Sequence, residues 1–161
     1  MAYIKEKKHY LTLKGLEQLR QDLETTKQEK MRKIKEEAPG TSDYREASVE
    51  YIQYQEELEA LEKKILYLQH ILEHHALIKL PPKGKRDRVY LGAKVLVEAD
   101  GQVDEFEIIG SFEADPLEGK ISDQSPVGKA LLGQRAGSEI KVKTPILEYA
   151  YKILKIHYEK E

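Results

Sequence analysis

Two acidic residues three positions apart, Asp43 and Glu46, carry the clearest potential chemistry in the sequence. On the first turn of a helix, this spacing puts both carboxylates on one face. Paired carboxylates can hold or share a divalent cation, and magnesium takes oxygen ligands. The alternative is structural, because acids at the start of a helix cap its free N–H groups and complement its dipole.

A strongly basic run precedes these acids. Residues 27–35 hold five cations against one acid, whereas residues 36–62 hold nine acids against one cation. Lys27, Lys30 and Lys33 could follow a nucleic-acid backbone, where each phosphate contact releases counterions. The alternative is a solvated helix face with i,i+4 pairs such as Glu29 with Lys33. Segments of opposite charge predict contacts with different partners, or with different parts of one partner.

Three histidines and two tyrosines are weaker candidates. His70 and His74 are four apart and His75 is adjacent, a spacing at which two histidines can ligate zinc. The sequence offers no third ligand and no glutamate in the metalloprotease order, so we expect surface packing there instead. Tyr44 and Tyr51 lie close to the acids, where they could stack on a base.

The segment SDQSP, residues 122–126, reads as a turn that enters a short helix. Ser125 is a natural N-cap, Pro126 suits the first helical position, and Gly133 suits the residue just past the end. Good capping chemistry is one explanation of this segment. The functional alternative is an exposed knob that docks on a partner.

Two long helices are expected to position the acids. We expect Thr12 to cap the first helix and Pro39-Gly40 to end it, with the second helix running from Ser42 or Asp43 to about Ala76. The apolar residues along the second helix, its seam, keep a 3.5-residue repeat, which predicts that it packs against another helix as a coiled coil. Because the break at Pro39-Gly40 is short, the first helix is the expected antiparallel partner. The expected seam residues are Leu16, Leu19, Leu23, Thr26, Lys30 and Lys33 in the first helix, and Tyr51, Tyr54, Leu58, Leu61, Ile65, Leu68 and Leu72 in the second.

After the Pro81-Pro82 boundary the apolar period changes from 3.6 to 2. Alternation predicts strands over residues 94–99, 103–109, 139–143 and 149–158, with a hairpin turn at Asp100-Gly101 and a bulge near Ile153-Leu154. With the short helix after Ser125, this predicts a small antiparallel sheet crossed by one helix. The fold class is therefore α+β.

Composition excludes several classes of protein. The chain has no cysteine, which excludes disulfide scaffolds, thiolate zinc sites and cysteine nucleophiles. No apolar run approaches the ~20 residues of a membrane span, and the first residues lack the apolar core of a signal peptide. We therefore expect a cytoplasmic protein without membrane contacts, and a monomer, although the long seam could also pair between chains.

The chain resembles the Gre transcript-cleavage factors of bacterial RNA polymerase over nearly its whole length. The most specific matching stretch is KISDQSPVGKALLG at residues 120–133. The other matching stretches are LTLKGLEQL at residues 11–19, EY at 50–51, EAD at 113–115 and KTP at 143–145. The order of elements also fits: coiled coil, acidic tip, linker, and sheet with one helix.

The resemblance implies a hairpin domain over residues 1–78, with an acidic tip near residues 38–50, and an FKBP-like domain over residues 79–161 that docks on the polymerase. The expected polymerase-binding residues are Asp123, Gln124, Ser125 and Pro126. The coiled coil would enter the secondary channel, with its basic face near the 3′ end of the nascent RNA.

For the chemistry, the resemblance implies that Asp43 and Glu46 help to hold a Mg²⁺ ion of the polymerase active site. They would also position water for attack on a phosphodiester of backtracked RNA. The polymerase would perform the reaction, so the factor would not itself be an enzyme and would carry no cofactor when free. DNA-binding is a further property that the resemblance implies.

The sequence departs from the family pattern at the tip. Cleavage factors read close to Asp-Leu-Ser-Glu-Asn-Ala-Glu-Tyr, and alignment on Glu50-Tyr51 puts Tyr44 and Ala47 at the two acidic positions. Two alternatives therefore stay open beside cleavage stimulation. One is a Gre-fold paralogue that occupies the channel and modulates or inhibits the polymerase, and the other, on fold analogy alone, is a prolyl isomerase.

Overall fold

The computed structural model describes residues 8–36 and 49–159. The chain divides into two compact units. One comprises Met1–Gly15 together with His75–Glu161, and the other comprises Leu16–His74. The expectation assigned residues 1–78 to the hairpin domain, whereas contacts group the first 15 residues with the C-terminal part of the chain.

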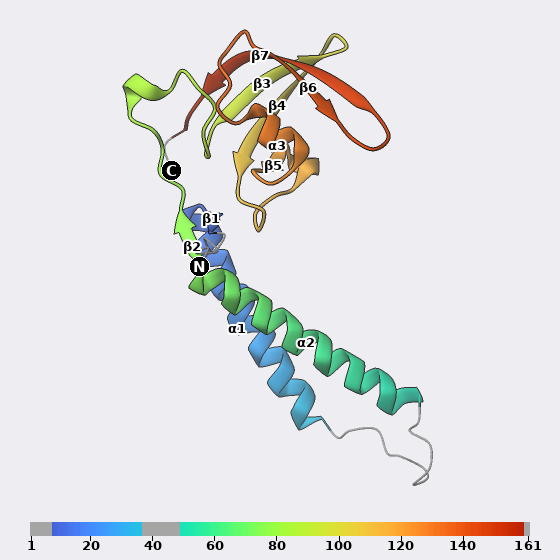
Figure 1. The fold of residues 1–161 in the computed structure, drawn as a ribbon. Helices are drawn as coiled ribbons and strands as arrows, with labels where there is room; N and C mark the ends of the chain where they lie inside the picture. The colour runs from blue at the N-terminus through green and yellow to red at the C-terminus, as the bar shows by residue number, and fades with distance from the viewer. Residues whose placement is uncertain (1–7, 37–48, 160–161) are drawn as a thin grey trace, which may run out of the picture. The chain divides into compact units, whose positions relative to one another are not determined.

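Two helices, α1 (Leu13–Lys35) and α2 (Val49–Glu73), lie side by side in the second unit (Figure 1). Their pairing is antiparallel, because Lys30 contacts Glu62 whereas the later Lys33 contacts the earlier Glu57. The predicted antiparallel hairpin is confirmed. We call the end where α1 finishes and α2 starts the loop end of the hairpin.

The seam between the helices is apolar over one part of its length. Its buried residues are Leu16, Leu19 and Leu23 of α1, with Leu68 and Ile71 of α2. Thr26 is also buried, and its hydroxyl donates to the carbonyl of Asp22 at 2.7 Å, which satisfies the buried polar group. The remaining predicted seam residues are only half-buried: Lys30 and Lys33 of α1, and Tyr51, Tyr54, Leu58, Leu61, Ile65 and Leu72 of α2.

Helix α1 begins as predicted, because the backbone N–H of Gly15 donates to the Thr12 hydroxyl oxygen at 2.9 Å. A second contact comes from far along the chain. The Glu113 carboxylate accepts from the Thr12 backbone N–H at 2.8 Å and from the Thr12 hydroxyl at 2.5 Å. A Cβ at position 15 would lie 2.0 Å from the Glu113 carboxyl carbon, so a larger residue there would displace this carboxylate from Thr12.

The expected end of the second helix near Ala76 is wrong. Helix α2 ends at Glu73, and strand β2 (His75–Leu77) follows, paired in parallel with β1 (His9–Leu11). The apolar pattern continues past the helix end, so periodicity alone could not separate the helix from the strand. Residues 75–77 form a strand because they pair with β1, which lies 66 positions earlier in the chain. The expected start at Ser42 or Asp43 lies outside the described residues.

A five-stranded sheet forms the core of the first unit, in the order β5-β4-β3-β7-β6. Its strands are β3 (Lys94–Ala99), β4 (Gln102–Ile109), β5 (Lys120–Ser122), β6 (Glu139–Lys143) and β7 (Glu148–His157). The hairpin turn between β3 and β4 is confirmed, with positive φ at Asp100 (50°) and Gly101 (78°). The sheet is mixed rather than wholly antiparallel, because β5, which the sequence analysis missed, runs parallel to β4.

The predicted bulge in the last strand is also confirmed. Leu96 pairs with Lys155 and the next residue, Val97, pairs with Ile153, so Leu154 is the extra residue of β7. The bulge lets Ile153 and Ile156 both turn toward the apolar core.

Helix α3 (Pro126–Leu131) contributes to this core with the buried Leu131. The other fully buried side chains of the core come from the sheet and the segment before it: Val89, Ala93, Val95, Val97, Ile108 and Ile153. Two short 3₁₀ turns, η1 (Lys83–Lys85) and η2 (Pro116–Glu118), complete the unit. The predicted α+β fold is confirmed.

Truncation of Leu19, which is fully buried in the hairpin seam, should destabilise the hairpin. We expect Leu19→Ala to lower the free energy of unfolding of the helices by about 2–5 kcal/mol, because it leaves a cavity. Leu66→Ala is the matched control, since Leu66 lies on α2 with 60% of its surface exposed. Thermal denaturation followed by circular dichroism measures both, and equal effects would contradict the assigned seam.

Candidate functional site

The two predicted catalytic acids, Asp43 and Glu46, lie in residues 37–48, outside the described part of the chain. Tyr44 and Ala47 lie there too. The structure does describe the two helix ends that flank this segment, Lys35 on α1 and Val49 on α2. In chain order the acidic segment connects these two helix ends.

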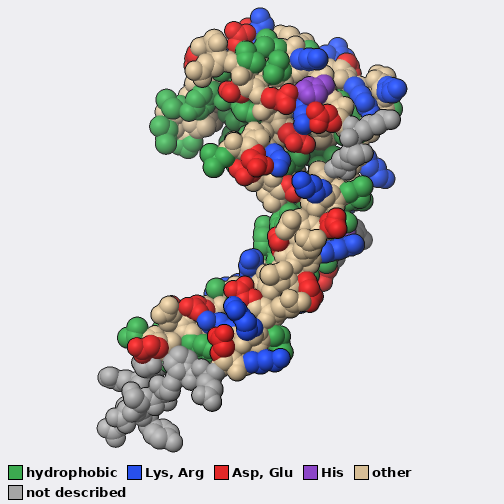
Figure 2. All heavy atoms as spheres, turned by 180° about the vertical axis from the view of Figure 1, so that it is seen from behind, with side chains coloured by type: hydrophobic (Ala, Val, Ile, Leu, Met, Phe, Trp, Pro, Cys, Tyr) green, Lys and Arg blue, Asp and Glu red, His purple; other side chains and the backbone are tan. Residues whose placement is uncertain are grey.

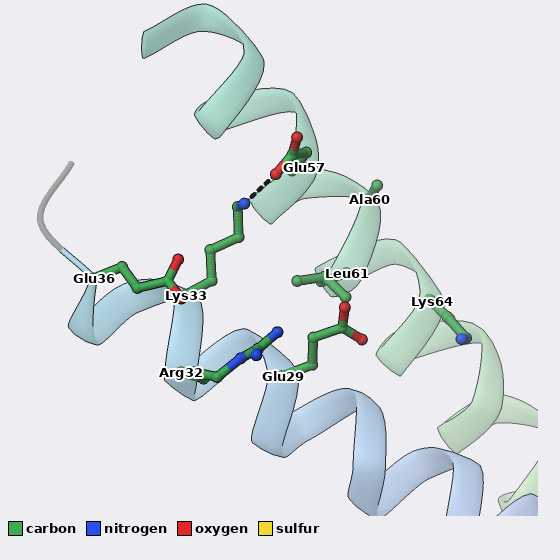
Figure 3. A pocket seen from close by; sticks show the side chains of 8 residues that line it. All are labelled: Glu29, Arg32, Lys33, Glu36, Glu57, Ala60, Leu61 and Lys64. Atoms are coloured by element: carbon green, nitrogen blue, oxygen red, sulfur yellow. Dashed lines mark hydrogen bonds and ion pairs between the residues drawn. The ribbon is translucent and has the colours of Figure 1, made fainter. Parts of the chain in front are cut away.

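The seam at the loop end is held by polar contacts (Figure 3). Lys33 forms an ion pair with Glu57, and the Tyr54 hydroxyl donates to the Lys33 carbonyl at 3.2 Å. The Lys33 ammonium also lies 5.6 Å from the centre of the Tyr54 ring, within the range of a cation–π contact. One lysine therefore joins the two helices through its backbone carbonyl and its ammonium group.

Lys30 repeats this arrangement one turn earlier, with its ammonium 3.3 Å from a Glu62 carboxylate oxygen. Of the three cations predicted to face nucleic acid, Lys30 and Lys33 are thus half-buried in the seam and paired with α2, whereas Lys27 is exposed. Because their acidic partners are exposed, these pairs contribute little stability each.

The Lys33–Glu57 contact shifts both pKa values. The hydrogen bond to Glu57 raises the pKa of Lys33 above its ordinary value, and the same bond lowers the pKa of Glu57. Both charged forms are therefore favoured around neutral pH.

A groove of about 310 Å³ lies between the helices beside this pair. Figure 3 shows its lining, which has three cations, three acids and an apolar floor. The lining residues are Glu29, Arg32, Lys33, Glu36, Glu57, Ala60, Leu61 and Lys64. Equal numbers of opposite charges give the groove no preference for an anion or a cation.

The histidines lie at the other end of α2. The ring centres of His70 and His74 are 4.4 Å apart, and Nδ1 of His74 lies 2.9 Å from the carbonyl oxygen of His70. His75 belongs to β2. Over residues 8–36 and 49–159, no group of three or more His, Cys, Asp or Glu side chains is placed to hold a metal ion.

The turn at residues 122–126, which we call the Ser–Pro turn, is held by a dense set of hydrogen bonds. The Ser125 side chain accepts from the Gly128 backbone N–H at 3.0 Å and donates to the Ser122 carbonyl at 2.7 Å. The Ser122 side chain accepts from the Gln124 backbone N–H at 3.0 Å. The predicted N-cap at Ser125 is confirmed, with Pro126 in the first turn of α3.

The four predicted docking residues differ in exposure. Asp123 is buried, and one of its carboxylate oxygens accepts from the Gln124 side-chain amide at 2.6 Å. Gln124 and Ser125 are half-buried, and Pro126 is exposed. The buried Asp123 therefore helps to hold the turn in place, whereas Gln124, Ser125 and Pro126 are at least partly accessible to solvent.

Two residues that the sequence analysis did not single out also shape the turn. The Ser111 hydroxyl oxygen lies 2.7 Å from that of Ser122, and a Cβ at Gly128 would lie 2.0 Å from the Ser122 carbonyl oxygen. Gly128 follows Ser125 by three residues, so the close approach follows from the cap geometry. Ser111 is 11 positions away from its partner, and no local pattern in the sequence indicates the contact.

Comparison with known proteins places this chain in a family. Residues 83–158 match the family described as "Transcription elongation factor, GreA/GreB, C-term". Over 157 residues the chain is 40% identical to transcription elongation factor GreA of Clostridium acetobutylicum, covering 94% of this chain and 98% of that protein. This chain belongs to the GreA/GreB family. It is also 38% identical to GreA of Geobacillus kaustophilus, over 94% of this chain and 98% of that protein.

The family identifies the chain as a GreA-like transcription elongation factor. Among solved structures, GreA factor homolog 1 (Gfh1) of Thermus thermophilus is 29% identical, with a TM-score of 0.41, over 94% of this chain and 99% of that one. No helix among the described residues is both long and apolar enough to cross a membrane.

Acid should weaken the contact between the helices at the loop end. Because the pKa of Glu57 is lowered in the folded chain, its contribution is complete above the ordinary glutamate pKa of about 4.3 and is lost as the pH falls through the lowered value. We expect wild type to melt at a higher temperature than Glu57→Gln near neutral pH, and the difference to shrink as the pH falls below the ordinary glutamate pKa.

Glu59→Gln is the control, because Glu59 is exposed on the same helix and lies 3.7 Å from Lys63 of α2 itself. It should melt like wild type at every pH. A pH-independent difference for Glu57→Gln would contradict the assigned ion pair.

Proposed function

We propose that this factor binds bacterial RNA polymerase, enters its secondary channel and stimulates cleavage of backtracked nascent RNA. The observation that carries the proposal is 40% identity to a GreA over nearly the full length of both chains. The fold supports it, because the Asp43–Glu46 segment is carried at the loop end of a two-helix hairpin. We further propose that the factor acts in the cytoplasm as a monomer.

In this proposal Asp43 and Glu46 lend carboxylates to a Mg²⁺ ion in the polymerase active site. The ion supplies Lewis-acid activation there. The hairpin contributes position: burial of Leu19 and Ile71 in its seam holds the helices together, and the Lys33–Glu57 pair joins them near the loop end. The exposed Lys27 would face the RNA near its 3′ end. In this proposal the polymerase itself cleaves the RNA, so the factor acts as a stimulator rather than an enzyme.

A second function is supported by the offset of the tip acids. The ungapped register on Glu50-Tyr51 puts Tyr44 and Ala47 where cleavage factors carry acids, one residue after Asp43 and Glu46. One residue rotates a helix by about 100°. A factor whose carboxylates point away from the metal would occupy the channel and inhibit the polymerase without stimulating cleavage.

A transcript-cleavage assay on stalled elongation complexes distinguishes the two functions. We expect wild type to stimulate cleavage, and Asp43→Ala and Glu46→Ala each to reduce the rate about 100-fold, the order typical when one charge-stabilising group is removed. Glu56→Ala is the matched control, because Glu56 is an exposed acid further along α2 and should leave the rate unchanged. Inhibition of elongation by wild type, insensitive to both tip substitutions, would favour the second function.

We also propose that the factor docks on the polymerase through the Ser–Pro turn. Substitution of its exposed residue Pro126 tests this. We expect Pro126→Arg to weaken polymerase binding about 30-fold, because a bulky side chain at the centre of a rigid interface prevents close contact. Lys129→Ala is the control, since Lys129 is exposed on the same helix. Equilibrium binding to core polymerase measures both, with melting temperature as the check on folding. Wild-type affinity for Pro126→Arg would place docking elsewhere.

A further inference from the structure

A second basic surface lies on the globular unit, in the segment between β2 and β3. Residues 79–88 hold five cations against one acid, Asp87, in a chain whose net charge is −2. The cations are Lys79, Lys83, Lys85, Arg86 and Arg88. All except Arg86 are exposed. In Figure 1 this segment is the yellow-green stretch at the left of the unit that holds the five-stranded sheet, which we call the globular unit. Figure 2, seen from behind, shows Lys and Arg side chains at the corresponding right-hand edge.

The segment is fixed on the body of the unit by its two arginines and by Tyr158. Arg86 donates from Nε to the Pro81 carbonyl at 2.9 Å, and its guanidinium lies 5.6 Å from the centre of the Tyr158 ring. Arg88 donates to the Gly133 carbonyl at 3.2 Å, and the Tyr158 hydroxyl donates to the Arg88 carbonyl at 2.5 Å. The lysines are thus presented from an ordered backbone, which lowers the entropic cost of binding a partner.

The acid in the segment does not neutralise the lysines. Asp87 lies 3.2 Å from Nε of Arg135, a further cation brought to this surface from the loop after α3. Among the residues that the structure describes, Lys79, Lys83 and Lys85 have no acidic side chain within 4.0 Å. Three uncompensated ammonium groups on a fixed segment concentrate positive potential, which attracts a polyanion.

An apolar groove of about 360 Å³ includes Lys79, the first of these cations, in its lining. Two tyrosines, Tyr10 and Tyr90, also belong to its lining. The remaining lining residues are Leu77, Ile78, Pro81 and Leu91. Tyr90 is 38% exposed, so its ring is accessible to a planar ligand. Lysines along a backbone, with aromatic rings beside them, are the combination that binds single-stranded nucleic acids.

We propose that this surface binds single-stranded nucleic acid, with phosphates on Lys79, Lys83 and Lys85 and a base in the groove beside Tyr90. A duplex keeps its bases stacked inside and could use only the lysines. An acidic protein could also use the lysines, but it has no base to stack on a tyrosine. This surface shares no residue with the hairpin that carries Lys27. The proposal therefore does not depend on the tip acids or on RNA cleavage.

Fluorescence anisotropy with the full chain and no polymerase tests the site. The probes are a labelled RNA of about 12 nucleotides, the DNA of the same sequence, and the matching duplex. We expect either single strand to bind more tightly than the duplex, and the preferred strand identifies the source of the ligand. Tyr90→Ala should lose about tenfold in affinity for the single strand, whereas Tyr90→Phe, which keeps the ring, should bind like wild type.

The charge of the site is tested with the triple variant Lys79→Glu, Lys83→Glu, Lys85→Glu. It should lower the salt dependence of binding by about two in the slope of log K against log salt, because each contacted phosphate of a single strand contributes about 0.7. The matched control is Lys141→Glu, Lys143→Glu, Lys155→Glu, which changes the net charge equally at three exposed lysines of the same unit. The control should keep most of the slope.

Three results would overturn the proposal. The first is no binding of either single strand at about 50 mM salt. The second is equal loss in the two triple variants, which would make the effect one of net charge. The third is full competition by polyglutamate together with an unchanged affinity of Tyr90→Ala, which would assign the surface to an acidic protein.

Discussion

Burial of a few leucine and isoleucine side chains at one end of the helical seam is the constraint on which the hairpin depends. Leu19 and Ile71 are fully buried there, whereas the seam toward the loop end is only half-buried and includes the ion pairs of Lys30 and Lys33. Apolar burial stabilises by about 25 cal/mol per Å², and exposed ion pairs contribute little. Stability is therefore concentrated away from the end that carries Asp43 and Glu46. The loop end is joined by contacts that water and salt can weaken.

The Ser–Pro turn of the globular unit differs from the loop end, because hydrogen bonds between side chains and the backbone hold it. There, side chains bind the backbone: Ser122 accepts from the Gln124 N–H before α3, and Ser125 accepts from the Gly128 N–H in its first turn. The Asp123 carboxylate accepts from the Gln124 side-chain amide. A surface ordered in advance loses little entropy on binding. The same chain thus combines a turn ordered by its own hydrogen bonds with a hairpin whose loop end includes partly exposed ion pairs.

Sequence reasoning predicted most of the regular elements and their caps. Local rules were enough where the determining residues are neighbours, as at the Asp100-Gly101 turn, the Ser125 cap and the bulge in β7. They failed where partners are distant. Strand β2 looks like the continuation of a helix until β1 is placed beside it, and short β5 has no apolar pattern of its own. The pairing of Lys30 and Lys33 with α2 acids was likewise hidden, because the sequence shows a basic run but not which way its side chains turn.

The carboxylate of Glu113 has a consequence for the order of folding. It closes the start of α1 from a position 101 residues further on. During translation the first helix leaves the ribosome before that carboxylate exists, so at first only the local Thr12 cap closes its start. Synthesis of Glu113 then supplies the acceptor for the Thr12 N–H and hydroxyl.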